Sequence, residues 1–303
     1  MSMETNPMGA PGRTVSTRGV PIARHRIGVA GLSLIAFALL AAASWGFILL
    51  GGDSGFQELF SHETWANAGS FIGELAGKGS GERAAFLQPG KWAHAGKLAY
   101  ETLAMSVLAI GFAGVGALLT FLPAARNVAV GELAPARRGL PTWKALYFVV
   151  RIIFTFTRGI PELILAMIII FFLSPGILPG ALALGLHNYG ILGKLSAEVV
   201  ENLDTHPARA LRASGAGSFQ MLAYAIMPQV LPQFITYLLY RWEVVIRTTI
   251  VVGFVSAGGL GRDFRLSMSF FHYTDVALLL IWYILLVIGI DLLCAWLRRL
   301  VRT

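Results

Sequence analysis

Charged side chains stand inside segments that are otherwise apolar. Arg158 and Glu162 are four residues apart, as are Glu243 and Arg247, which is the spacing of an ion pair on one face of a helix. An ionisable group at the centre of a bilayer costs at least about 2.5 kcal/mol, so such groups pair, face a bundle interior or line a route. Guanidinium groups also bind oxyanions through two parallel N–H donors. These residues either neutralise one another or contact an anion that crosses the membrane.

Arg241 and Arg247 are the best candidates for contact with an anion. No group near them in the sequence other than Glu243 balances the two positive charges. Thr248 adds a hydroxyl donor beside them. A route must release its ion, so we expect few ligands and no tight site. The candidate pathway residues are Arg158, Glu162, Arg241, Glu243, Arg247 and Thr248. The sequence leaves open whether they line a route or only lock broken helices.

The glycine-rich stretch at residues 253–264, GFVSAGGLGRDF, could be mistaken for a nucleotide-binding loop. It lacks the preceding strand and the Lys-Ser/Thr pair of a P-loop. We expect instead a tight re-entrant turn near an external gate, formed around Gly258, Gly259 and Gly261. The six histidines are scattered without metal-ligand spacing, and no Ser/His/Asp or Cys/His arrangement stands out. The sequence therefore predicts no catalytic residues, no metal and no cofactor.

The composition predicts the environment of these residues. Of the 303 residues, 56% are hydrophobic and 13% are charged, and the mean hydropathy is +0.68. Soluble domains carry about 25% charged residues, so the composition indicates an integral membrane protein in contact with membrane lipid. The net charge of +8 is typical of Lys and Arg enrichment in cytoplasmic loops, and nucleic-acid binding is not predicted.

Six segments are apolar and long enough, at about 20 residues, to cross a bilayer. They are residues 28–50, 98–122, 144–173, 177–197, 219–253 and 275–297. The third and fifth are too long for one straight span. Proline breaks the helical hydrogen-bond ladder, so we expect a kink or split around Pro161 in the third and around Pro228 and Pro232 in the fifth. The predicted fold is an all-α polytopic membrane protein with about six transmembrane helices.

Lys and Arg are distributed unevenly between the two sides of this predicted bundle. The segments predicted on the N-terminal side hold 12 of these residues, and the loops on the opposite side hold 6. The N-terminal-side segments are residues 1–27, 123–143, 198–218 and 298–303. The bias places both termini in the cytoplasm of a cell whose plasma or inner membrane the chain crosses several times.

The predicted organisation has three parts. They are a disordered basic tail at residues 1–27, a first transmembrane helix with an external loop at residues 28–97, and the main transmembrane domain at residues 98–303. The loop 51–97 is interpreted either as a mobile loop or as a helix lying on the membrane, anchored by Trp65 and Trp92.

One predicted cytoplasmic stretch has the pattern of a short helix followed by a sharp turn. Thr205 can cap the helix and Pro207 suits its first turn. The helix ends at Gly215, which readily adopts a left-handed conformation. A second helix begins near Ser218 and runs until Pro228.

The short helix has a narrow apolar edge. Ala208 and Leu211 contribute to this edge, whereas Arg209 and Arg212 lie one turn apart on another face. Such an edge suits a groove on a partner protein. The alternative is a surface helix that contacts nothing.

The same stretch resembles the loop by which permease subunits of binding-protein-dependent ABC importers grip their ATPase. Residues 209–211 (Arg-Ala-Leu) stand where that motif reads Glu-Ala-Ala, and the interval from Gly215 to Pro228 is kept. Arg209 departs from the family's Glu. The resemblance implies that the short helix is a cytoplasmic coupling helix. The implied ATPase-coupling residues are Pro207, Arg209, Ala210, Leu211, Arg212 and Gly215.

Further stretches resemble the phosphonate and phosphate branch of these importers. They are RGIPEL at residues 158–163, LPQ at 231–233 with YRWE at 240–243, and AGGLG at 257–261. The resemblance covers about residues 100–262. It implies a permease subunit for phosphonate, phosphate or a similar oxyanion, an external substrate-binding protein and a homodimer. Because the chain has no Walker A motif, the ATP-binding subunit must be separate, in two copies.

Two other functions are weighed against this one. A permease of the same superfamily could carry another solute, such as an amino acid or a quaternary amine, but a cationic solute would favour carboxylates or aromatic cages over arginines. A membrane-embedded enzyme acting on phospholipid head groups would need clustered Asp or His residues for a metal, and the sequence has no such cluster.

Overall fold

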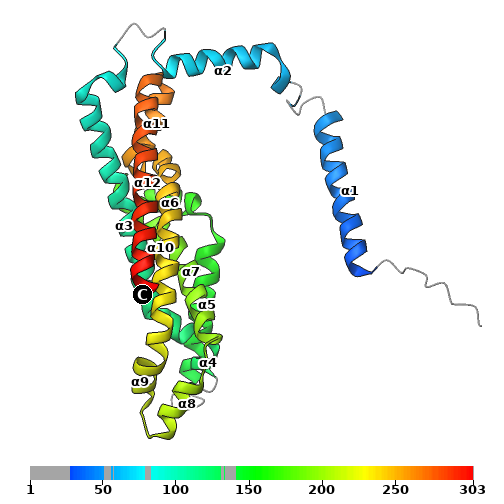
Figure 1. Cartoon of the computed structure of the whole chain (residues 1–303), viewed down its shortest axis with the longest axis vertical. Coiled ribbons are helices and arrows are strands. Elements are labelled where there is room, and N and C mark those ends of the chain that lie inside the picture. The colour runs from blue at the N-terminus through cyan, green and yellow to red at the C-terminus, as the bar shows by residue number, and fades with distance from the viewer. Residues whose placement is uncertain are drawn as a thin grey trace, which may run out of the picture. The chain divides into compact units, whose positions relative to one another are not determined.

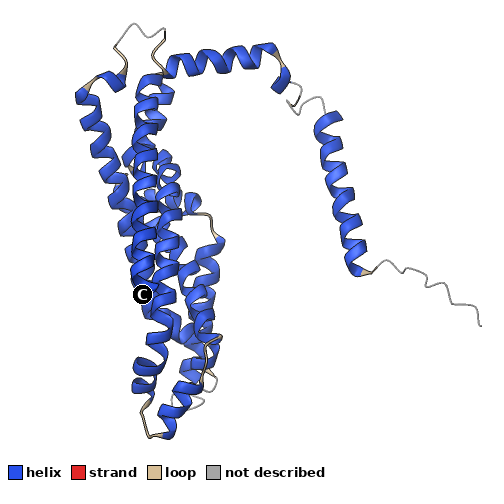
Figure 2. Cartoon of the chain, viewed as in Figure 1, coloured by secondary structure: helices blue, strands red, loops and turns tan. Residues whose placement is uncertain are grey.

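The computed structural model describes residues 28–50, 56, 58–78, 83–130, 133 and 141–302. In this part of the chain every regular element is helical and no strand occurs (Figure 2). The predicted all-α class is therefore confirmed. The predicted basic tail, residues 1–27, lies outside the described residues.

The chain divides into two compact units, one ending at Ala68 and one beginning at Gly69. The first unit contains α1 (Val29–Leu50), η1 (Glu58–Phe60) and the start of α2 (His62–Leu75). The 22 residues of α1 are apolar on all faces and none is buried. A helix of this kind is long enough to span a bilayer.

The predicted external loop 51–97 contains helices in its described residues. After α2 come η2 (Ala85–Leu87) and the first turns of α3 (Pro89–Ala124). Trp92 belongs to α3, where its indole N–H donates to the carbonyl oxygen of Phe86 at 2.8 Å and its ring packs against Trp282. The ring of Trp92 is thus half-buried against a core cluster, and its role as a membrane anchor stays a prediction.

Small residues let α3 pack closely against α7 (Ile177–Glu201). Ala109, Ala113 and Ala117 are fully buried and recur every four residues along α3. A Cβ on Gly185 of α7 would lie 3.1 Å from the carbonyl oxygen of Ala109. Such close backbone approach is how helices associate where water supplies no driving force. The larger buried side chains around this contact include Met105, Phe121, Phe154, Leu184, Leu192 and Phe234.

The predicted break in the third apolar segment is confirmed. α5 (Pro141–Gly159) and α6 (Glu162–Ile170) meet at an angle of 93°. Pro161 lies between them in an extended conformation, with ψ of 139°. Proline and its predecessor both disfavour continuation of a helix, which explains the position of the bend.

The fifth segment is not split at its two prolines, and its largest bend lies further along the chain. It comprises α9 (Ser218–Met221), the π-helical turn η3 (Leu222–Ile226), α10 (Met227–Val252), the π-helical turn η4 (Gly253–Ala257) and α11 (Gly259–Ser269). The chain stays helical through Pro228 and Pro232, with η3 immediately before the first proline. The bend, of 49°, lies at Gly258 instead.

Within the second unit, α8 (His206–Ala213) and α9 lie at one end of the bundle. The start of α3, α11 and the start of α12 (Tyr273–Arg302) lie at the other end (Figure 1). The α8 end also contains α4 (Arg126–Ala129), which Glu201 of α7 contacts by accepting a hydrogen bond from the Arg126 backbone N–H at 2.7 Å. Two segments predicted to share the cytoplasmic side thus lie together.

Within the described residues, length and apolar character identify fewer spans than the sequence predicts. α1, α3 and α12 satisfy both criteria, and the number rises to five if each bent pair is one span. α7 is not among them, since its polar side chains include Asn188, Lys194 and Glu198. The predicted number of six spans stays a prediction.

Candidate functional site

The N-terminus of α8 is capped by Asp204. Its Oδ1 accepts a hydrogen bond from the backbone N–H of His206 at 3.0 Å and lies 2.6 Å from the imidazole Nδ1 of the same residue. The backbone hydrogen bond from His206 is the largest cause that lowers the pKa of the Asp204 carboxyl below its ordinary value. The predicted cap by Thr205 is wrong, because the Thr205 side chain forms no capping hydrogen bond.

The C-terminus of α8 has the glycine turn that the sequence predicts. Gly215 has a φ of +87°, in the left-handed region. The Gly215 N–H donates to the carbonyl of Arg212 at 3.1 Å, and the Ala216 N–H donates to the carbonyl of Leu211 at 3.0 Å. This pair of bonds is a Schellman motif, which satisfies carbonyls that the helix leaves open. The next helix, α9, begins at Ser218 as predicted.

The apolar edge of α8 faces its own bundle. Ala208 is 1% exposed, and Leu211 packs half-buried against the same core cluster, which contains Met221. The prediction that this edge fits a partner groove is therefore wrong. The opposite face is exposed and consists of Pro207, Arg209, Ala210 and Ala213.

Phe219 extends this outward surface beyond the glycine turn. It is 81% exposed on the first turn of α9. An aromatic side chain of this exposure next to a turn is a common anchor at protein interfaces. The exposure of Phe219 was not predicted, because in the sequence this residue begins an apolar helical segment.

Arg241 of α10 contacts α7 through a neutral side chain. Its Nε and Nη2 atoms both donate to Oδ1 of Asn188, at 2.8 and 2.6 Å. Asn188 is 2% exposed, and its Nδ2 donates to the Leu184 carbonyl at 2.7 Å. Asn188 was not predicted from the sequence, where it is an amide in a run of mostly apolar and small residues.

The ion pairs predicted within one helix are wrong for Glu243 and Arg247. Arg247 Nη2 lies 2.7 Å from Asp291 Oδ2, and Arg298 Nη1 lies 2.6 Å from Glu243 Oε1. Both partners belong to α12, so each pair joins α10 to its neighbour. Thr248 donates to the Val245 carbonyl of its own helix at 3.1 Å.

The predicted pair of Arg158 and Glu162 is also wrong. The 93° bend separates α5 from α6, so the two residues do not share one helix face. Glu162 Oε2 lies 3.5 Å from Nε2 of His187 instead. Arg158 is exposed at the end of α5. Among the described carboxylates, none forms an ion pair with Arg158 or with Arg241.

The glycine-rich turn is fixed by close packing. Gly258 and Gly259 have φ values of +100° and +69°. The N–H of Leu260 donates to Oγ1 of Thr102 on α3 at 2.9 Å, and a Cβ on Gly259 would lie 2.5 Å from that oxygen. A Cβ on Gly261 would overlap the carbonyl oxygen of Ile250. The turn expected around these glycines is present, and α11 follows it.

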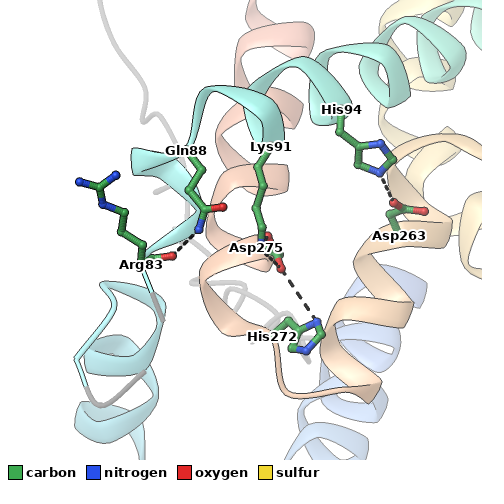
Figure 3. Close-up of polar contacts among 7 residues, drawn as sticks. All are labelled: Arg83, Gln88, Lys91, His94, Asp263, His272 and Asp275. Atoms are coloured by element: carbon green, nitrogen blue, oxygen red, sulfur yellow. Dashed lines mark hydrogen bonds and ion pairs between the residues drawn. The ribbon is translucent and has the colours of Figure 1, made fainter. Parts of the chain in front are cut away.

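Polar contacts join α11 and the starts of α3 and α12 at the end of the bundle opposite α8 (Figure 3). Lys91 Nζ lies 2.7 Å from Asp275 Oδ1, and His94 Nε2 lies 2.9 Å from Asp263 Oδ2. His272 Nδ1 is 3.9 Å from Asp275 Oδ2. In the described part of the chain, no group of three or more His, Cys, Asp or Glu side chains is arranged to hold a metal ion.

Residues 142–303 match the family of binding-protein-dependent transport system inner membrane components. The chain belongs to this family. It is therefore a permease, the non-catalytic, multi-pass inner membrane subunit of an ABC importer. A separate ATPase subunit and a substrate-binding protein are its partners.

Two characterised relatives show the extent of the similarity. The permease is 38% identical over 199 residues to the phosphite transport system permease protein PtxC of Stutzerimonas stutzeri, covering 66% of this chain and 68% of the relative. It is 34% identical over 208 residues to the phosphate-import permease protein PhnE of Mycolicibacterium smegmatis, covering 69% of this chain. The match spans 37% of that longer relative.

Two solved structures show the same fold. One, of the inward-facing MetNI methionine ABC transporter, aligns with a TM-score of 0.55 and 23% identity over 68% of the permease and 94% of that chain. The other, an amino acid ABC transporter with histidines, aligns with a TM-score of 0.52 and 17% identity over 65% and 89% of the two chains. At these identities the likeness concerns the fold alone.

Proposed function

We propose that the permease forms the membrane route for a phosphite-, phosphate- or phosphonate-type oxyanion. The names of the two relatives, one for phosphite and one for phosphate, support this substrate class. The observation that carries the proposal is the guanidinium of Arg241. It lies half-buried within the helix bundle and is bound by a neutral amide, so its charge is available to an anion.

Arg241 fits the requirements of a transient anion contact. A guanidinium has five N–H donors in one plane, and Asn188 uses donors on only one of its edges. Two parallel donors can bind two oxygens of a phosphate-like anion. Arg247 is a weaker candidate than the sequence suggested, because Asp291 already pairs with it. One cation with few further ligands releases its ion readily.

The outward face of α8 is proposed to dock the ATPase. Pro207, Arg209, Ala210 and Gly215 are exposed around the Schellman turn, and Phe219 adds an exposed aromatic side chain. Leu211 and Arg212 would act by holding α8 against the bundle, since both are half-buried. If the ATPase binds here, the α8 end of the bundle is cytoplasmic, which agrees with the orientation predicted from Lys and Arg.

A homodimer is proposed because each chain offers one α8. Two ATP-binding subunits present two grooves, and a second copy of the permease supplies the second helix. The route would then run between the two copies. The glycine turn at residues 258–259 is proposed to lie near its external gate, at the end of the bundle opposite α8.

Uptake into proteoliposomes tests the oxyanion proposal. The complete importer, with its ATPase and binding protein, is reconstituted, and ATP-dependent uptake of labelled phosphate and phosphite is compared with uptake of methionine. We expect uptake of an oxyanion and none of methionine. Arg241→Lys should lower the oxyanion rate about tenfold or more, because Lys lacks the planar pair of donors.

The matched control is Arg262→Lys, which makes the same change at an exposed position on α11. It should leave uptake unchanged. Co-purification of the ATPase shows that each variant assembles. Transport at the wild-type rate by both Arg241→Lys and Arg241→Gln would show that this arginine is structural. Uptake of methionine in place of either anion would favour the alternative solute class.

A further inference from the structure

Asn188 is a buried amide whose oxygen and nitrogen both form hydrogen bonds. It is 2% exposed, and burial of an amide is unfavourable unless its groups are bonded. Its Nδ2 donates to the Leu184 carbonyl at 2.7 Å, and its Oδ1 accepts two hydrogen bonds from Arg241. The opposite rotamer would direct an NH₂ group at the guanidinium. The hydrogen bond to the Leu184 carbonyl therefore fixes the orientation of the Asn188 amide, so that its oxygen faces Arg241.

A guanidinium fixed along one edge is fixed along the other, because the group is planar. Asn188 Oδ1 is bound by Nε at 2.8 Å and by Nη2 at 2.6 Å. The remaining donors are the two N–H groups of Nη1 and the second N–H of Nη2. One N–H group of Nη1 and the remaining N–H group of Nη2 point in the same direction. This pair of donors can bind two oxygens of an oxyanion.

Arg241 has a neutral hydrogen-bond partner, whereas three other arginines form ion pairs with carboxylates. In the described residues, Arg151 pairs with Glu201, Arg247 with Asp291 and Arg298 with Glu243. Each of those cations is neutralised by a carboxylate. In the same part of the chain, the side chain hydrogen-bonded to Arg241 is the neutral amide of Asn188, and no carboxylate forms an ion pair with it.

Glu162 is the carboxylate that acts on Arg241. It interacts electrostatically with Arg241, but its carboxylate lies beside His187 Nε2, at 3.5 Å. His187 is held in turn by the Ile160 carbonyl, 3.0 Å from its Nδ1. The Glu162 carboxylate thus lies beside the His187 ring and forms no ion pair with Arg241.

We propose that Asn188 is a positioning and specificity residue for the anion contact of Arg241. It orients the guanidinium so that two donors face the ligand, and as a neutral acceptor it leaves the charge that attracts a phosphate-type oxyanion. The inference rests on the proposed function, because it presupposes that Arg241 contacts the transported ion.

Asn188→Asp separates this role from a purely structural one. Asp has the same shape and can accept the same two hydrogen bonds, and it converts the contact into an ion pair. A structural role predicts that the ATPase co-purifies as with the wild type and that phosphate uptake is unchanged. The proposed role predicts normal co-purification but at least a tenfold lower rate of ATP-dependent phosphate uptake. The new carboxylate would neutralise the positive charge of Arg241 that attracts the anion.

Asn202→Asp is the matched control, since it makes the same substitution on the exposed end of the same helix. It should transport phosphate at the wild-type rate. A rescue variant adds Glu162→Gln to Asn188→Asp, which restores the local net charge. We expect it to recover uptake at least threefold relative to Asn188→Asp alone, and no recovery would overturn the charge argument.

Asn188→Ser covers the case in which the Asp variant does not assemble. Serine is neutral but too short to hold the guanidinium edge, so the apparent KM for phosphate uptake should rise about tenfold or more while the maximal rate falls less. Wild-type uptake by either Asn188 variant, in an importer whose wild type carries phosphate, would overturn the role of Asn188. No phosphate or phosphite uptake by the wild type would overturn the proposed function itself.

Discussion

Gly215 and Gly259 both adopt a positive φ, but their surroundings are opposite. At Gly215, with φ of +87°, an added Cβ would meet no atom within 4 Å, and the residue is exposed. At Gly259, with φ of +69°, an added Cβ would lie 2.5 Å from Thr102 Oγ1 and the residue is buried. Both residues avoid the steric penalty that a Cβ brings in the left-handed region.

The difference indicates where each turn is used. The turn at Gly259 is required by packing within this chain, because α11 lies directly against α3 there. The turn at Gly215 is required only to set the angle between α8 and α9, since nothing in the described bundle fills the space around it. We therefore assign the buried turn at Gly259, the inner turn, to the stability of the permease. We propose that the solvent-exposed turn at Gly215, the outer turn, serves coupling to the partner ATPase.

The largest expected effect is that of Gly259→Ala. A left-handed alanine costs about 1–2 kcal/mol, and forcing a methyl group against α3 costs about 1–3 kcal/mol more. Thermal unfolding of the purified permease should show a clearly lower Tm and a lower yield. Gly111→Ala on α3, where a Cβ would meet nothing within 4 Å, is the control and should be neutral or slightly stabilising. Equal Tm values for the two variants would contradict the packing account.

Thr102→Val tests the same turn from the opposite side. Valine cannot accept the Leu260 N–H, and a buried donor left unbonded costs about 1–3 kcal/mol. We expect a Tm below that of the wild type but above that of Gly259→Ala. Thr155→Val is the control, because the Thr155 hydroxyl is exposed and bonds only the Arg151 carbonyl of its own helix. If both threonine variants unfold alike, the bond to Leu260 contributes nothing measurable.

Gly215→Val should change coupling more than stability. The left-handed strain is again about 1–2 kcal/mol, but no neighbouring atom obstructs the side chain. We expect a well-folded permease in which substrate no longer stimulates ATP hydrolysis by the partner subunit. Gly217→Val, at a φ of −69° and ψ of 162°, carries no such strain and should stay coupled. Normal stimulated ATPase activity in Gly215→Val would remove the assigned role of the outer turn.

The smallest effect concerns Asp204 at the start of α8. Its pKa is lowered in the folded chain, chiefly by the backbone hydrogen bond from His206, so the cap is present above the unfolded pKa of about 3.9 and is lost as the pH falls through the folded pKa. Asp204→Asn should speed hydrogen exchange in α8 slightly at pH 7. In the wild type, comparable exchange should appear only in acid, and a wild-type α8 that loosened between pH 5 and pH 8 would contradict this assignment.

The sequence correctly predicted features that depend on residues adjacent in the chain, such as helix ends at proline and glycine. The bend before Glu162 follows from Pro161, and the end of α8 follows from Gly215. The fold class follows from composition. At Pro228 the chain is not split, and a π-helical turn directly before the proline keeps it helical there.

Features that depend on contacts between distant helices were not recovered. Arg247 pairs with Asp291 on another helix, although Glu243 has the spacing for a pair within α10. Ala208 and Leu211 could have faced a partner, and only the packing of α8 against η3 shows that they face inward. α11 is only 11 residues long, begins with two glycines on either side of Leu260 and is polar overall, so the sequence predicted only a turn there.

Labelling of a cysteine on α8 tests most directly whether the outer turn belongs to the ATPase interface. The chain has one cysteine, Cys294, which is buried, so Ala210→Cys in a Cys294→Ala background gives a single exposed thiol. The account predicts that bound ATPase slows its modification at least tenfold, while Ser269→Cys at the opposite end of the bundle reacts at an unchanged rate. Equal modification of Ala210→Cys with and without co-purifying ATPase would contradict the account.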